Sequence, residues 1–169
     1  MPNRVISFFQ VTGAARASPD TGGFGAERLA AKPLFSRHMN AGVYETRAAL
    51  GDLVQALGSA GLDAETIDNT ELILAEVLNN IAEHAYVDGE GPVAVQVMCH
   101  RNGLVCEVSD HGRALMSGAL PDPALPKIDP PDHLPEGGFG WHIIRSLACD
   151  LSYRRDGGSN RLIFRVPCA

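Results

Sequence analysis

Residues 71–86, ELILAEVLNNIAEHAY, decide the fold because they combine two patterns on one predicted helix. Polar residues at intervals of four, Glu76, Asn80 and His84, form a stripe along one side of that helix. Asp63 precedes the pattern and is a suitable helix cap, which predicts a helix over residues 64–86. Apolar residues recur beside the stripe with helical spacing, at Ile67, Ile73, Leu74, Val77, Leu78, Ile81 and Ala85.

The polar stripe suggests chemistry as well as structure. A carboxylate and an amide one turn apart suit a general base and a magnesium ligand, since Mg²⁺ takes oxygen ligands and leaves positions for phosphate oxygens and water. Asn79 offers a second polar wall, whereas Glu83 is typical of a solvated charge. By itself such a stripe is more typical of an exposed helix face, so other segments must support the assignment.

Before this helix, periodic apolar residues predict another helix, capped by Asn40 and ended by Gly58 and Gly61. Residues 28–39 are expected to be extended, and Pro33 favours an edge position. Residues 1–27 are rich in Ala, Ser, Pro and Gly, which predicts an arm that is flexible or adds one strand. The folded domain is therefore expected to cover residues 28–169.

After the helix, alternating residues predict strands over 93–100 and 104–110, joined by a tight turn at Asn102-Gly103. A second hairpin is predicted from residues 151–155 and 161–167, with a turn between them. Residues 112–137 contain six prolines without a sustained period. A loop of that length in a small domain is usually functional, and a disordered insertion is the alternative.

Two further motifs flank this loop. Asp110-His111-Gly112 stands where a strand ends, so the carboxylate can accept a hydrogen bond from an exocyclic amine such as that of adenine, and Gly112 permits close approach to the ring. The alternative is an ordinary D-x-G turn. Gly137-Gly138-Phe139-Gly140 opens a helix, whose free N–H groups make an anion site suited to a di- or triphosphate. The Lys of a P-loop is lacking.

Composition limits the classes of protein. The chain has 169 residues, 45% hydrophobic and 20% charged, enough for one domain with a packed core. A formal charge of −6 argues against direct binding of nucleic acid, and no apolar run is long enough to span a membrane. The cysteines lack metal-binding spacing and fit reduced thiols of a cytoplasmic protein: Cys99, Cys106, Cys149 and Cys168.

Taken in order, these motifs resemble the GHKL ATPases, the family of histidine kinases, gyrase-type topoisomerases and mismatch-repair ATPases. ELILAEVLNNIAEHAY resembles the N box, VSDHG the G1 box and EGGFGWHII the G2 box. The resemblance covers about residues 34–167, and within the family the chain is most similar to small anti-sigma-factor serine kinases. It implies an α+β fold: a two-layer α/β sandwich with a mixed, mostly antiparallel sheet backed by helices, and an ATP lid.

The resemblance also implies roles for individual residues. Glu76 matches the general base, and Asn80 matches the magnesium ligand. Arg113 and Lys127 are lid cations able to reach the γ-phosphate, and Ser159 can place a hydroxyl near the phosphates, although a plain turn over residues 158–161 is the simpler interpretation. The expected nucleotide-binding set is Asn80, His84, Asp110, Gly112, Arg113, Gly138, Phe139, Gly140 and Ser159.

The function implied is an ATP- and Mg²⁺-dependent serine/threonine-protein kinase that acts as an anti-sigma factor. Its expected partners are a STAS-type anti-sigma antagonist as substrate, a sigma factor and a second copy of the chain, in the cytoplasm and without membrane or nucleic acid. Two alternatives remain open at this point. One is a nucleotide-dependent binding module without phosphoryl transfer, and the other is a stand-alone catalytic domain of the histidine-kinase type.

Overall fold

The computed structural model describes residues 32–87, 89–115, 120 and 139–168. All of them belong to one compact unit, residues 31–169. The arm predicted for residues 1–27 and most of the loop predicted for residues 112–137 lie outside the described residues. Both therefore stay predictions.

A five-stranded sheet forms one layer of the domain, with the strand order β1-β2-β3-β5-β4. All four pairings are antiparallel, so the described sheet contains none of the parallel pairing that a mixed sheet would have. The α+β two-layer architecture predicted from the sequence is confirmed. The strands are β1 (Phe35–Asn40), β2 (Pro92–His100), β3 (Gly103–Asp110), β4 (Cys149–Asp156) and β5 (Ser159–Val166).

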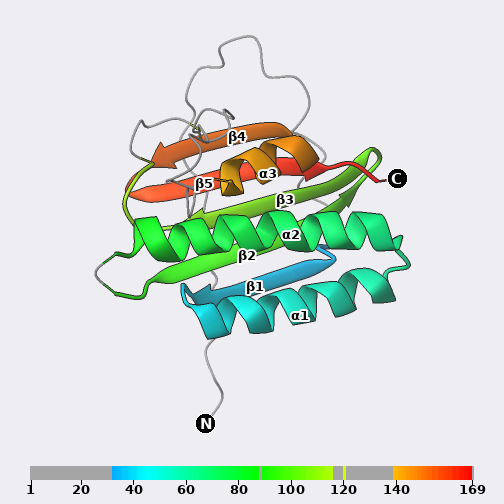
Figure 1. Ribbon diagram of the computed structural model, residues 1–169, viewed down its shortest axis with the longest axis horizontal. Helices are drawn as coiled ribbons and strands as arrows, with labels where there is room; N and C mark the ends of the chain where they lie inside the picture. The colour runs from blue at the N-terminus through cyan, green and yellow to red at the C-terminus, as the bar shows by residue number, and fades with distance from the viewer. Residues whose placement is uncertain (1–31, 88, 116–119, 121–138, 169) are drawn as a thin grey trace, which may run out of the picture. The chain divides into compact units, whose positions relative to one another are not determined.

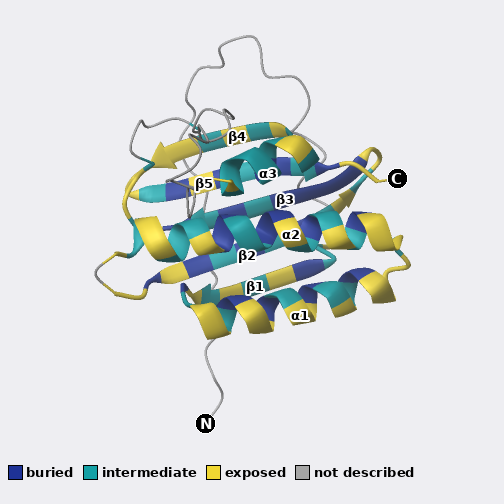
Figure 2. Cartoon of the chain, in the orientation of Figure 1, coloured by how far each residue is buried: buried dark blue, intermediate teal, exposed yellow. Residues whose placement is uncertain are grey.

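The helices form the second layer and cover the same face of the sheet (Figure 1). They are α1 (Val43–Ser59), α2 (Ala64–Asn80) and α3 (Gly140–Leu147). Helix α2 packs against both α1 and α3, so the helix with the polar stripe takes the central position of its layer. The burial pattern follows from this: α2 is buried along the side that faces the sheet and exposed along the other (Figure 2).

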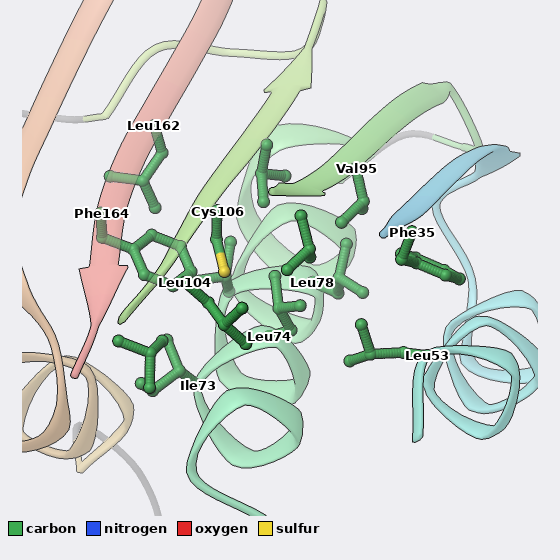
Figure 3. Close-up of a cluster of buried hydrophobic side chains, with 14 of the residues drawn as sticks. Phe35, Leu53, Ile73, Leu74, Leu78, Val95, Leu104, Cys106, Leu162 and Phe164 are labelled. Atoms are coloured by element: carbon green, nitrogen blue, oxygen red, sulfur yellow. The ribbon is translucent and has the colours of Figure 1, made fainter. Parts of the chain in front are cut away.

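The hydrophobic core lies between the layers and fits the two periods found in the sequence. Strand residues two positions apart, such as Val93, Val95 and Val97, point toward the helices. Leu74 and Leu78 of α2 pack among the strand side chains (Figure 3). Since Leu74 is fully buried, its truncation to Ala would cost about 2–5 kcal/mol. This core holds α2 in a fixed position over β2 and β3.

The two long helices begin differently from each other. Asp63 caps α2 as predicted, because its Oδ1 accepts from the backbone N–H of Thr66 at 2.8 Å. That hydrogen bond is the main cause of a lowered pKa of Asp63. The cap predicted for α1 is wrong: Asn40 is the last residue of β1, paired with Pro92, and the helix starts at Val43 after Gly42. Backbone pairing with β2 has overridden the capping tendency of Asn40.

Two segments near the presumed site differ from expectation. Helix α2 does not continue as an α-helix to residue 86 but ends at Asn80 and passes into a π-helical turn, η2 (Ile81–Ala85). Such turns occur frequently at functional sites. The hairpin predicted around residues 156–160 is confirmed, but its turn is shorter than predicted. Gly157 and Gly158, with φ of 53° and 85°, make a two-residue turn, so Ser159 and Asn160 already belong to β5.

Candidate functional site

A cavity of about 740 Å³ lies where α2 and η2 meet the end of β3, the start of β5 and the start of α3. Its volume is typical of a site for a small molecule or cofactor. The wall is largely apolar with a few polar side chains, a composition that suits a flat heteroaromatic base with polar substituents. The polar lining residues are Asn80, His84, Asp110, Arg113, Tyr153 and Asn160; the others are Val77, Ile81, Ala85, Val87, Val108, Ala114, Leu115, Trp141 and Leu162.

Asp110 is a buried carboxylate in this wall, at the last position of β3. Its Oδ1 accepts from the backbone N–H of Gly112 and from Nδ2 of Asn160, both at 2.8 Å. Among the described residues these are the hydrogen bonds found to its side chain, and neither uses Oδ2. A ligand that brings an N–H donor into the cavity can therefore bond to Oδ2. The predicted D-x-G turn is therefore present, and recognition of a ligand amine by Asp110 stays a prediction.

Glu76 and Asn80 meet the first residue of α3. A Cβ placed on Gly140 would lie 2.6 Å from Oε2 of Glu76 and 3.5 Å from Nδ2 of Asn80. A Cβ requires more room than 2.6 Å, so Gly140 is what allows α3 to begin so close to the α2 carboxylate. The polar stripe of α2 and the N-terminus of the glycine-led helix therefore come together, although 60 residues of sequence separate Asn80 from Gly140.

The side-chain amide of Asn80 is the one buried side-chain group among the described residues that has no hydrogen-bond partner. A buried amide nitrogen without a partner is costly, and a bound water or ion is one of the things that can satisfy it in a native structure. An Asn amide can also be turned over, which exchanges its oxygen and nitrogen. In one orientation the group can donate to a phosphate oxygen, and in the other its oxygen can ligate Mg²⁺. The residues present thus fit a magnesium–nucleotide complex.

The loop after β3 is attached to the end of η2. The backbone N–H of Arg113 donates to the carbonyl oxygen of Ala85 at 2.9 Å, and a Cβ on Gly112 would lie 2.5 Å from that oxygen. The close approach of Ala85 therefore requires a glycine at position 112, and the predicted approach of Gly112 to a ligand ring stays a prediction. Through this contact the helix with Asn80 and the strand with Asp110 hold each other in position.

Tyr86 makes a second link between the same segments. Its hydroxyl donates to the carbonyl of Pro92 at 2.9 Å and accepts from the backbone N–H of His111 at 2.8 Å. The ring occupies the space beside Gly91, where a Cβ would lie 2.0 Å from a ring carbon. Burial is the main reason that the pKa of Tyr86 is raised. The hydroxyl therefore stays protonated and able to donate at neutral pH.

The remaining predicted residues divide into three groups. His84 lines the exposed end of the cavity, with its imidazole 4.0 Å from the Glu83 carboxylate, and Arg113 lines it as well. Phe139 and Ser159 are outside the lining; Phe139 is exposed, and the Ser159 hydroxyl is directed to the backbone oxygen of Asp110 at 3.4 Å. Gly138 and Lys127 lie outside the described residues.

Among the lining residues with a hydrogen-bonding group in the side chain, three were not predicted from the sequence: Trp141, Tyr153 and Asn160. A signal existed for Asn160, because it begins a period-two series whose other members, Leu162, Phe164 and Val166, are apolar and buried. A polar residue in an inward-facing series requires buried partners. Trp141 follows Gly140 directly and could have been expected near any ligand of that helix end.

A known protein family matches the segments that form the cavity. The family described as "Histidine kinase-like ATPase domain" matches residues 40–166. The chain belongs to this family. The match includes α2, the Asp110 strand end and the start of α3, so the histidine kinase-like ATPase assignment covers every part of the cavity.

Relatives within the histidine kinase-like ATPase family include serine-protein kinases named RsbW from Bacillus cereus and Bacillus anthracis. Each is 29% identical to this chain over 105 residues, which are 61% of this chain and 66% of the relative. A crystal structure of the RsbU and RsbW domains of a Mycobacterium tuberculosis protein shares the fold, with a TM-score of 0.51 and 16% identity. It covers 79% of this chain and 33% of that one.

These relatives are named serine-protein kinases, and the matching family is described as an ATPase domain. Within the described residues, no helix is both long and apolar enough to cross a membrane.

Proposed function

We propose that this chain is an ATP- and Mg²⁺-dependent serine/threonine-protein kinase and anti-sigma factor, whose substrate is a STAS-type anti-sigma antagonist. The observation that carries the proposal is that Asp110 and Asn80 line one cavity, while Gly140 and the Glu76 carboxylate meet next to Asn80, outside that lining. The similarity to RsbW serine-protein kinases supports the choice of a hydroxyl acceptor.

In this proposal adenine occupies the apolar part of the cavity and donates its amine to Oδ2 of Asp110. The phosphates lie toward the N-terminus of α3, whose first N–H groups have no partner within the helix and favour an anion. Asn80 and phosphate oxygens would hold Mg²⁺, and the bound ion would neutralise phosphate charge. Arg113 at the cavity wall would supply a further positive charge.

The transfer step needs one base and an aligned acceptor. Glu76 would accept the proton of a Ser or Thr hydroxyl of the substrate as that oxygen bonds to the γ-phosphorus, and the bond to ADP breaks. The products are a phosphoester, ADP and the proton held on the carboxyl group. Positioning supplies most of the rate, and a general base contributes about 10²–10⁴-fold. Gly140 keeps Glu76 next to the phosphate site.

The test is a mass measurement of candidate STAS-domain proteins after incubation with the chain and Mg-ATP. We expect the substrate to gain the mass of one phosphoryl group. Glu76→Gln should abolish the gain while ATP still binds. Asn79→Ala is the matched control, because Asn79 adjoins Asn80 on α2 but is exposed, and the gain should survive. ATP binding that is absent, or unchanged in Asp110→Ala, would overturn the site.

The alternatives give different results in the same experiment. A binding module that transfers no phosphoryl group would bind Mg-ATP and a regulator, with no gain of mass in any partner. A histidine-kinase-type domain would give a product whose phosphate is lost in acid, whereas phosphoserine persists. Binding of a sigma factor and homodimerisation are further parts of the proposal, and sedimentation with and without a sigma factor tests both.

A further inference from the structure

Asn160 is a buried polar side chain directly behind the carboxylate assigned to adenine. It is 4% exposed, and its amide contacts three segments of the chain. Nδ2 donates to Oδ1 of Asp110 at 2.8 Å and to the backbone oxygen of Arg113 at 3.0 Å. Oδ1 accepts from the hydroxyl of Tyr153 at 2.8 Å and from the guanidinium of Arg155. Nothing in the proposed catalytic step uses this network.

The orientation of the amide follows from its neighbours. Arg155 has only donors, so the atom that it contacts must be the amide oxygen. Asp110 as a carboxylate has only acceptors, so the atom that faces it must be the amide nitrogen. Exchange of oxygen and nitrogen would place donor against donor and acceptor against acceptor. The side chain is therefore held in one orientation by charged groups on both sides.

This orientation determines which oxygen of Asp110 is available. Two donors, the Asn160 amide and the Gly112 backbone, converge on Oδ1 and restrict rotation of the carboxylate. Oδ2 is the oxygen that these two hydrogen bonds leave available to a ligand of the cavity that Asp110 lines. A carboxylate oxygen accepts from the exocyclic amine of adenine, whereas guanine presents a carbonyl oxygen at the corresponding position and would be repelled.

We propose that Asn160 is a positioning residue. It binds Oδ1 of Asp110, leaves Oδ2 as the acceptor for the ligand, and so determines the preference for adenine over guanine nucleotides. The proposal rests on the proposed nucleotide site and deepens it. Asn160 acts through Asp110 and needs no contact with the reacting atoms.

The Asn160 amide also binds the backbone that follows Asp110. Nδ2 contacts the carbonyls of Gly112 and Arg113, at 3.4 and 3.0 Å, while Arg155 also donates to the Gly112 carbonyl. Tyr153 accepts from the backbone N–H of Leu115 at 3.2 Å. Loss of the Asn160 amide would therefore release both the Asp110 carboxylate and the backbone of residues 112–113.

The experiment measures dissociation constants of Mg-ATP and Mg-GTP by calorimetry for the full chain and its variants. Asn160→Ala removes a hydrogen bond to a charged group, so ATP affinity should fall about tenfold to a hundredfold. GTP affinity should change much less, so that the preference for ATP shrinks. Ser109→Ala is the matched control, since Ser109 precedes Asp110 on β3 and faces the opposite side of the sheet.

Asn160→Asp adds a second measurement, the pH dependence of ATP binding, which should not change if Asn160 has only a structural role. The variant keeps the shape and the acceptor for Tyr153 and Arg155 but places two carboxyl groups together, which must then share a proton. ATP binding should be weak at pH 8 and recover toward pH 6, where the shared proton replaces the amide donor. His84 and His111 also lie near the cavity, so the wild-type protein is measured at both pH values.

The outcomes separate the inference from the proposed function. Wild-type affinity and wild-type ATP preference in both Asn160 variants would overturn the inference while the nucleotide site stands. No ATP binding by the wild-type protein would overturn both. If Asn160→Ala does not fold, Asn160→Asp and Tyr153→Phe still decide, because Tyr153→Phe should reduce the ATP preference in part, and an unchanged preference in both contradicts the network.

Discussion

Substitution of Gly140 by Ala tests whether the position of Glu76, and not merely its presence, controls phosphoryl transfer. The added Cβ would lie 2.6 Å from Oε2 of Glu76, whereas carbon and oxygen atoms in contact are normally about 3.5 Å apart. The carboxylate must therefore retreat by about 1 Å. The same Cβ would lie 3.5 Å from Nδ2 of Asn80, which is an ordinary contact and needs no movement.

We expect Gly140→Ala to lower the rate of phosphoryl transfer without unfolding the protein. Displacement of a catalytic group by about 1 Å can cost on the order of 10²-fold in rate, so Gly140→Ala should lower the transfer rate by about that factor. ATP affinity should fall much less than the rate, because the added Cβ meets Asn80 only at an ordinary contact distance and does not reach Asp110. Stability should change little, since the atom that the Cβ meets is the end of the flexible Glu76 side chain.

The assay combines the rate of phosphate transfer to the STAS-domain substrate, calorimetry with Mg-ATP, and thermal unfolding. Gly51→Ala is the matched control, because Gly51 lies within α1 and its added Cβ would meet no atom within 4 Å. That variant should be more stable and fully active. An unchanged transfer rate in Gly140→Ala would refute the reasoning, and so would a loss of ATP binding with an intact Glu76.

Three other predictions follow from the described contacts. Gly112→Ala should cost about 1–3 kcal/mol of stability and weaken ATP binding, because the Cβ would lie 2.5 Å from the Ala85 backbone oxygen; a wild-type melting temperature would contradict this. Trp141 is the single tryptophan and lines the cavity, so Mg-ATP should change the intrinsic fluorescence of the wild type but not of Asp110→Ala; unchanged emission with calorimetric binding would contradict the placement. Asp63→Ala should lower the urea midpoint at pH 7. Because the folded-state pKa of Asp63 is lowered, its stabilisation is present above its ordinary value of 3.8 and is lost as the pH falls through the lower folded pKa, so the difference should vanish in acid.

Much of the architecture could be predicted because it depends on local patterns. The apolar period of α2, the Asp63 cap and the hairpin of β2 and β3 each depend on a few residues, and the structure confirms all three, with the hairpin turn at Arg101-Asn102, one residue before the predicted position. Asn40 shows the limit of such patterns. Asn40 is a good capping residue, but pairing of β1 with β2 keeps it in the sheet. Its pairing partner, Pro92, is 52 residues away, so the sequence around Asn40 does not indicate this pairing.

The site residues also divide into those that a local motif predicts and those that depend on contacts between distant segments. Asp110 and Asn80 were identified by motif, and both line the cavity; their roles stay proposals. The π-helical turn after Asn80 was not predicted, because its apolar pattern is close to that of an ordinary helix end. Asn160 was assigned to a turn because the glycines before it are turn formers, whereas its partner Asp110 lies 50 residues earlier in the sequence.

The sequence by itself determined the elements, the family resemblance and which short motifs carry polar chemistry, since each depends on periodicity or on residue types at fixed spacing. Only the tertiary structure decided which atoms meet: Oε2 of Glu76 beside Gly140, the Ala85 carbonyl beside Gly112, and the Asn160 amide on one oxygen of Asp110. Contacts between distant segments depend on how the two layers pack, and packing is a property of the whole core, which no single segment encodes.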